Sequence, residues 1–123
     1  VGGGLQPALQ VWGAVQSLPE PGLAIVTAGK RDLSYDIALP VPELHHRLGA
    51  TTSPTPLDAE RLRVTALNDQ HAYLAIPEDV DWQVGDFVGL GISHPCTTFD
   101  KWRLLHLVDD DWNVIGGVRT YLA

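Results

Sequence analysis

The stretch "LRVTALNDQHAYLAIPEDVDWQVGDFVGLGIS", residues 62–93, decides the fold class. Its first part, "LRVTALND", alternates apolar and polar residues, and "HAYLAIP" follows it directly. "VGD", residues 84–86, predicts a turn that leads into a further apolar run, "FVGLGIS". Alternation with a period of two, interrupted by turn residues, is typical of short β-strands. We therefore expect consecutive short strands here.

The sequence on both sides continues this pattern. "ALQVWGAVQSLP", residues 8–19, alternates and predicts a strand. A helical pattern can also be drawn through it, but Gly13 and the valines disfavour a helix. "LAIVTAG", residues 23–29, predicts a second strand, and residues 102–122 predict a hairpin around the acidic turn Asp109 to Asp111. Short strands at this spacing predict an all-β fold, a small antiparallel barrel or sandwich, with residues 1–123 as a single domain.

Residues 30–60 break the pattern, because they contain many prolines and small polar residues. Proline removes a backbone donor, and such a composition predicts a long irregular loop. We expect His45 and His46, which lie in this segment, to be exposed to solvent rather than bound to a metal.

Composition limits the possible partners. The formal net charge is −7, which argues against a basic surface for nucleic acid or an anionic membrane. No apolar run approaches the roughly 20 residues of a membrane span.

The single cysteine cannot form an internal disulfide, which favours a cytoplasmic protein. The absence of methionine and the opening "VGGG" predict that the chain is a piece of a longer protein.

The segment "GISHPCTTFDKW", residues 91–102, places the only cysteine two residues after a histidine. If the preceding strand continues, His94 and Cys96 share a face, because side chains two apart in a strand point the same way. An imidazole nitrogen and a thiolate together favour zinc. Two ligands fit half of an open, catalytic metal site. Two alternatives are a Cys96 that is merely buried and a nucleophilic Cys96 paired with His94.

Several segments in order resemble one known family. "LQPALQVWGAVQSLPEPG", "TAGKRDLSYDIALP", "NDQHAYL", "VGDFVGLGISHPCTTFDKW" and "VIGGVRTYL" are similar to the C-terminal region of the D-threonine aldolase and D-serine dehydratase family. These are pyridoxal phosphate enzymes with the alanine-racemase type of fold. The resemblance implies an N-terminal (β/α)8 barrel that binds the cofactor and that is absent from this chain. It covers most of the chain, excepting the proline-rich part.

Carried over by residue, the resemblance implies that His94 and Cys96 are the metal ligands. The dehydratases carry His-x-Cys and use zinc, whereas the aldolases mostly carry His-x-Asp and take other divalent ions. Cys96 thus favours the dehydratase branch. His71 matches a histidine that lies near the site in the family and that contacts the substrate or supports the site. The alternative is that His71 lies at a strand end and bonds to a backbone group. Asp100 or Thr97 could orient His94.

The resemblance implies a metal-assisted β-elimination on a small D-amino acid in a homodimer. Lys30 and Lys101 are the only lysines, and both have charged neighbours, so neither is expected to bind pyridoxal phosphate. We therefore expect the isolated chain to be inactive. Three alternatives stay open: retro-aldol cleavage of D-threonine, a racemase-like reaction, and a noncatalytic β-barrel interaction module. A racemase would need an acid–base tyrosine, and Tyr35, Tyr73 and Tyr121 give no motif to select one.

Overall fold

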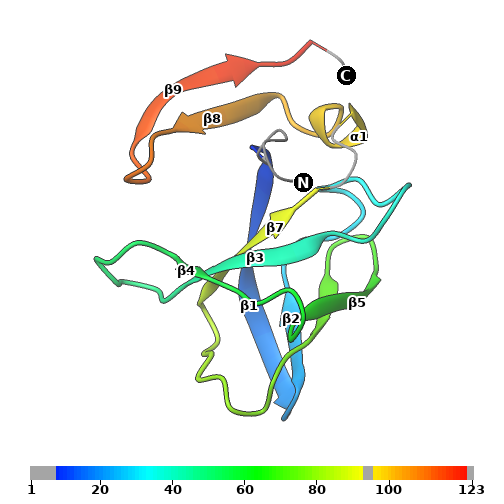
Figure 1. The fold of residues 1–123 in the computed structure, drawn as a ribbon. Coiled ribbons are helices and arrows are strands. Elements are labelled where there is room, and N and C mark those ends of the chain that lie inside the picture. Colours follow the sequence, from blue (N-terminus) through cyan, green and yellow to red (C-terminus); the bar gives the residue numbers. More distant parts are fainter. Residues whose placement is uncertain (1–7, 93–95, 122–123) are drawn as a thin grey trace.

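The computed structural model describes residues 8–92 and 96–121, which are almost entirely β-structure (Figure 1). In chain order the elements are β1 (Gln10–Glu20), β2 (Leu23–Val26), β3 (Val41–His46), β4 (Thr55–Pro56), β5 (Arg63–Leu67), β6 (Ala72–Ala75), β7 (Phe87–Gly91), α1 (Cys96–Phe99), β8 (Leu104–Val108) and β9 (Val114–Arg119). The predicted all-β fold is confirmed. Within the described residues, no helix is long and apolar enough to cross a bilayer.

Seven strands form one antiparallel sheet in the order β4-β3-β7-β1-β2-β6-β5. β5, at one edge, contacts β3 near the other edge, so the sheet curls into a partly closed barrel. The strands β8 and β9 pair only with each other, and their hairpin lies above one end of the barrel (Figure 1).

The core confirms the alternation read in the first strand. Val11, Gly13 and Val15 of β1 are buried, while the residues between them are more exposed. The inner faces of the neighbouring strands complete one apolar cluster. Its further members from strands are Ala24, Val26, Val64, Ala72, Leu74, Val88 and Leu90.

The prediction of a long irregular loop over residues 30–60 is wrong in its middle. β3 lies inside the sheet and pairs with β7, and β4 continues that sheet to its edge. The two prolines in these strands sit where a missing donor costs little. Pro42 lies at a register shift in the β3–β7 pairing, and Pro56 lies in the edge strand.

The expectation that His45 is exposed is also wrong. Its ring is nearly buried and stacks on Trp82, with ring centroids 5.0 Å apart. Its Nε2 lies 2.8 Å from Oδ2 of Asp86, which is buried and also accepts the backbone N–H of Gln83. Arg47 Nε completes the cluster at 2.9 Å from Oδ1 of Asp86. Buried charges are found paired because isolation in the interior is costly, so this cluster ties β3 to the turn before β7.

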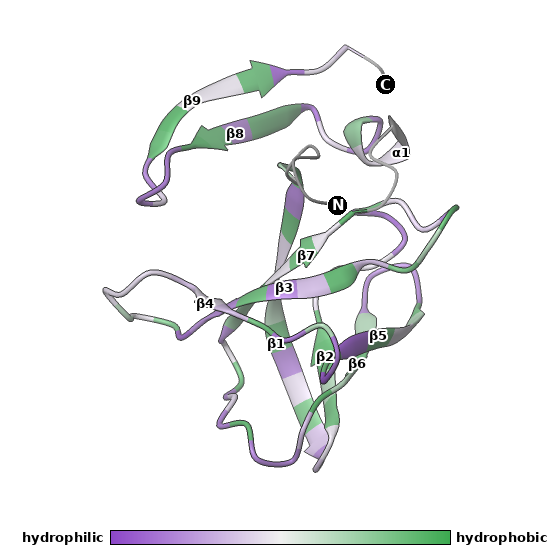
Figure 2. Ribbon diagram, in the orientation of Figure 1, coloured by the Kyte–Doolittle hydropathy of each residue, from purple (hydrophilic) through white to green (hydrophobic). Residues whose placement is uncertain are grey.

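The predicted hairpin around the acidic turn is confirmed as β8 and β9. Asp109 closes the turn, because its Oδ1 accepts the N–H groups of Asp111 and Asn113. Trp112 has a left-handed backbone, with φ of 66°, and its ring meets the ring of Trp12 in β1 edge-on at 5.3 Å. The hairpin ribbon is largely apolar in Figure 2, yet most of its large apolar side chains are exposed.

Candidate functional site

The segment that carries the predicted metal ligands is not a continuous strand. β7 ends at Gly91, and Cys96 begins the short helix α1. The strand alternation that placed His94 and Cys96 on one face therefore does not extend to Cys96. His94 lies outside the described residues, as does the Cys96 side chain, so the metal-ligand pair stays a prediction. In the described part of the chain, no group of three His, Cys, Asp or Glu side chains could hold a metal ion.

α1 is fixed by hydrogen bonds to a distant loop. Thr98 is buried, and its Oγ1 accepts the Ser34 backbone N–H at 2.7 Å and donates to Ser34 Oγ at 2.8 Å. Just beyond the helix, Trp102 Nε1 donates to the carbonyl oxygen of Asp32 at 2.6 Å. The 32–34 segment therefore holds the backbone of α1, and with it the start of the helix at Cys96.

His71 lies in the turn between β5 and β6 and is half-buried. Its backbone N–H donates to Asn68 Oδ1 at 2.7 Å, and its carbonyl accepts the Asn68 N–H at 2.9 Å. The same turn bonds to the loop after β2, because Lys30 and Arg31 donate their N–H groups to the carbonyls of Asn68 and Asp69. One loop, residues 29–34, thus contacts both the His71 turn and α1.

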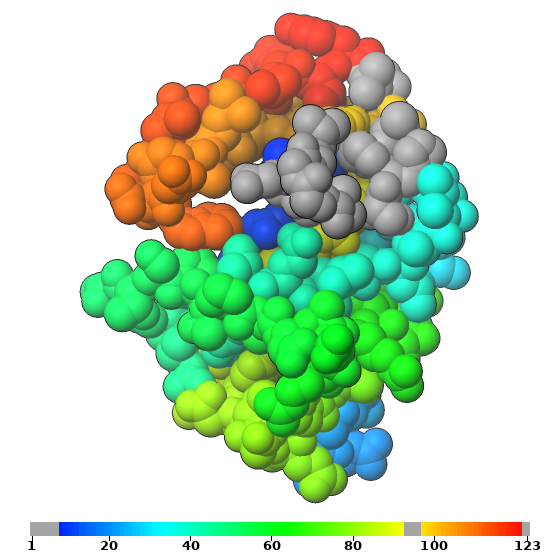
Figure 3. All heavy atoms as spheres, viewed as in Figure 1, coloured from blue at the N-terminus to red at the C-terminus, as the bar shows by residue number. Residues whose placement is uncertain are grey.

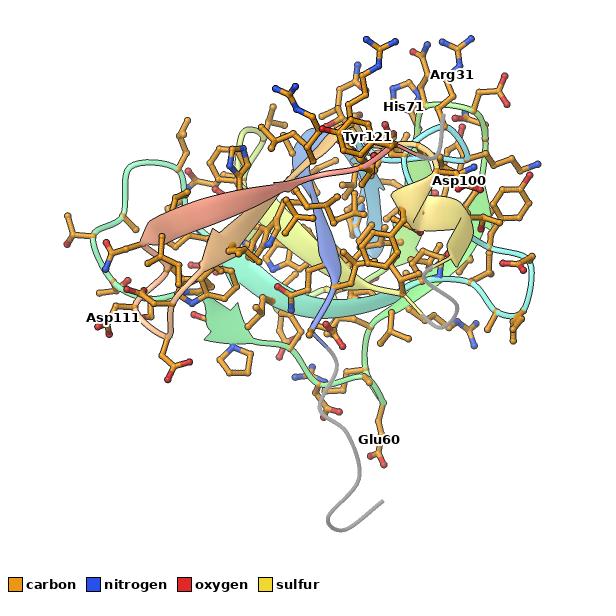
Figure 4. The ribbon with its side chains drawn as sticks, turned by 90° about the horizontal axis from the view of Figure 1, so that it is seen from above. Arg31, Glu60, His71, Asp100, Asp111 and Tyr121 are labelled. Atoms are coloured by element: carbon orange, nitrogen blue, oxygen red, sulfur yellow. The ribbon has the colours of Figure 1, made fainter. Side chains whose placement is uncertain are left out.

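The two loops border a polar pocket of about 480 Å³. Its lining residues are Gln16, Thr27, Arg31, Asp32, Gln70 and His71. Seen from above, Arg31, His71 and Asp100 lie toward the same side of the molecule (Figure 4). The structure therefore places His71 beside Arg31, a residue that sequence reasoning did not select. No local signal in the sequence marks Arg31, because the residues that its loop contacts, Asn68 and Asp69, lie far along the chain.

Gly29 makes the junction between these loops possible. A Cβ at this position would lie 2.5 Å from both Asn68 O and His71 N, and 2.6 Å from Gln70 N. These are backbone atoms, so relief requires the two loops to separate.

We expect Gly29→Ala to lower the free energy of unfolding by about 1–3 kcal/mol, the usual cost of overpacking. Amide exchange at Lys30 and Arg31 should also accelerate, because their bonds to the 68–71 turn open. Urea unfolding and hydrogen exchange measure these effects. Gly116→Ala is the matched control, because its Cβ would meet nothing closer than 3.7 Å. Equal stability of the two variants would contradict the close approach.

A larger cavity of about 740 Å³ lies between the β8–β9 hairpin and the main sheet, and Figure 3 shows an opening there. Its apolar walls include Trp12, Trp102, Trp112 and Phe87. Of the four tryptophans in the chain, Trp82 is buried in the core of the sheet. The other three line this cavity.

Comparisons with known proteins found one matching family and several solved structures with a similar fold. The model of the family described as "Putative serine dehydratase domain" matches residues 8–108, whereas no curated protein matches the chain. The D-threonine aldolase of Filomicrobium marinum is 23% identical, with a TM-score of 0.70 over 88% of this chain and 26% of that one. The D-threo-3-hydroxyaspartate dehydratase of Delftia sp. HT23 is 20% identical, with a TM-score of 0.64 over 90% of this chain and 31% of that one.

A third solved structure has the same TM-score of 0.64, at 19% identity over 90% of this chain and 31% of that chain. It is a D-threo-3-hydroxyaspartate dehydratase in which a cysteine is replaced by alanine, in a metal-free form. These likenesses show a shared fold, and this chain spans less than a third of each solved structure. Because the family model covers residues 8–108, which is most of the sequence, the chain belongs to the family of the serine dehydratase domain.

Proposed function

We propose that this chain is the C-terminal metal-binding β domain of a pyridoxal-phosphate- and zinc-dependent D-amino-acid lyase of the dehydratase type. The observation that carries the proposal is the family match over residues 8–108, a range that contains both His94 and Cys96.

The donor set fits zinc, because an imidazole nitrogen and a thiolate sulfur are both zinc ligands. His94 and Cys96 would hold the ion, and further positions would be left for substrate or for groups outside this chain. When bound, zinc would act as a Lewis acid on the departing β-hydroxyl, and pyridoxal phosphate would serve as the electron sink at the α-carbon.

The described residues of this chain would position these ligands and the substrate. The paired hydrogen bonds between Thr98 and Ser34 fix the backbone of α1, at whose start Cys96 stands. The Asn68 side chain fixes the backbone of His71 beside the polar pocket. From there, the His71 imidazole would bind or orient a polar group of the substrate. Such rigid support is what a site needs to hold reacting groups in place.

Product analysis on the full-length protein tests this proposal. The protein is incubated with pyridoxal phosphate and zinc, then separately with D-serine and D-threonine, with and without a chelator. We expect pyruvate and ammonia from D-serine, and we expect the chelator to suppress them. No turnover of either amino acid, nor of D-threo-3-hydroxyaspartate, would overturn the lyase assignment.

Retro-aldol cleavage is the second candidate, because the D-threonine aldolase has a TM-score of 0.70 against this chain. Glycine and acetaldehyde from D-threonine, without pyruvate from D-serine, would establish it. Both candidates require a cofactor-binding barrel outside this chain, and we propose that the complete protein is a homodimer. Light scattering of the full-length protein measures that state.

A further inference from the structure

The polar pocket beside His71 has the properties of an anion site. All six of its lining residues are polar, and they come from β1, from the end of β2 and from the two joined loops. We propose that this pocket binds a carboxylate through Arg31. This proposal rests on the lyase function proposed above. The carboxylate is the second carboxylate of the substrate, carried by the side chain of a 3-hydroxy-D-amino acid.

Arg31 supplies the positive charge. Within the described residues its guanidinium has no ion pair, whereas Arg47 is paired with Asp86 and Arg61 with Asp79. The one acidic residue in the pocket is turned to its own loop, because Asp32 Oδ2 accepts the Gly29 N–H at 3.0 Å. An unpaired guanidinium offers two parallel N–H donors, which match the two oxygens of a carboxylate.

The remaining lining residues add hydrogen-bond donors and no further negative charge. The amides of Gln16 and Gln70 and the imidazole of His71 can each donate to an anion. Thr27 Oγ1 accepts the Ala14 N–H at 2.9 Å, which leaves its own hydroxyl proton to donate.

The backbone around these donors is held in place. Arg31 N–H donates to Asp69 O at 3.0 Å, and Lys30 N–H donates to Asn68 O at 2.9 Å. On the other side, Asn68 Oδ1 accepts the N–H groups of Gln70 and His71. The backbones of Arg31 and His71 therefore stand in a fixed relation, so only the exposed Arg31 side chain has to be ordered when a ligand binds.

The first test is binding, which needs no catalysis. Succinate is titrated calorimetrically into the full-length protein and into its Arg31→Gln, Arg31→Lys and Arg63→Gln variants. Arg63 is exposed on β5 and outside the pocket, so it controls for the loss of one positive charge. We expect about tenfold weaker binding in Arg31→Gln, as for one lost charge-assisted hydrogen bond. Arg31→Lys should recover part of the loss, and Arg63→Gln should bind as wild type. Absent binding, or equal binding in Arg31→Gln and wild type, would overturn the anion site.

The second test compares substrates. The ratio of kcat/KM for D-threo-3-hydroxyaspartate to kcat/KM for D-serine should fall about tenfold in Arg31→Gln, by the same hydrogen bond. It should be unchanged in Arg63→Gln. If D-serine is turned over but the ratio is unchanged in Arg31→Gln, the pocket does not bind the side-chain carboxylate of the substrate, although the lyase function stands. If no amino acid is turned over, the proposed function fails with the substrate assignment, and the succinate titration alone decides the anion site.

Discussion

Replacing Asp86 with alanine is expected to lower the free energy of unfolding by about 3 kcal/mol, the lower end of the range for breaking a buried ion pair. The side chain of Asp86 is 1% exposed. Its removal leaves His45 Nε2 and the Gln83 N–H without their acceptor in the interior. Arg47 loses its buried partner at the same time. Chemical unfolding in urea measures the change through a lower midpoint.

Asp81→Ala is the matched control for this prediction. Asp81 also contacts Arg47, at 3.4 Å, but its side chain is 91% exposed. Exposed pairs contribute little, so we expect a change within about 0.5 kcal/mol. Equal effects of Asp81→Ala and Asp86→Ala would mean that burial of the cluster does not matter for stability.

The same carboxylate predicts a dependence of stability on pH. Burial acts to raise the pKa of Asp86, but hydrogen bonds from the Gln83 N–H, His45 and Arg47 outweigh it and hold the pKa below its usual value. A carboxyl with a lowered pKa stabilises the fold above its unfolded pKa of about 3.9, and this contribution is lost as pH falls through the folded value. Wild-type stability should therefore decline below about pH 4. Asp86→Asn should decline less steeply over the same window; identical profiles would contradict this assignment.

Replacing Cys96 with alanine in the full-length protein is expected to lower turnover of D-serine at least about a hundredfold, because a Lewis-acid metal contributes several kcal/mol to such a step. Bound zinc, measured by atomic emission, should fall in parallel. The reason is the donor set, since losing the thiolate leaves His94 as the only ligand assigned to this chain. Pyridoxal phosphate content should be unchanged, because the proposed function assigns the cofactor to a barrel outside this chain.

The control for Cys96→Ala is His106→Ala. His106 is exposed on β8 and has no assigned role in metal binding. We expect zinc content and activity close to wild type in this variant. Full activity and zinc content in Cys96→Ala would remove Cys96 from the site and leave it a packing residue.

Strand alternation predicted much of the sheet, because burial on one face imposes a period of two. β1 illustrates this: Val11, Gly13 and Val15 face the core as the pattern required. β3 was missed, because Pro42 and two adjacent histidines look irregular without knowledge of their neighbours. The register shift that accommodates Pro42 and the carboxylate of Asp86 that pairs with His45 come from distant parts of the chain. Tertiary context of this kind leaves no local signal.

For the candidate site, the sequence offered a donor pair, which stays a prediction, but it did not reveal the backbone geometry around that pair. His-x-Cys named a donor pair, yet the strand ends at Gly91 and Cys96 begins a helix. Pro95 was the available warning, because proline disfavours a continuing strand. The pairing of Arg31 with the His71 turn depends on contacts between residues about 40 positions apart, so no local pattern could reveal it.

The most direct test of the central claim, that Cys96 binds the metal of a D-amino-acid lyase, is an absorption spectrum of the cobalt(II)-substituted full-length protein. A thiolate bound to cobalt(II) gives a sulfur-to-metal charge-transfer band in the near ultraviolet, which nitrogen and oxygen ligands do not give. We expect this band in the wild-type protein and its loss in Cys96→Ser. The same band in both proteins, or in neither while cobalt is bound, would contradict the claim.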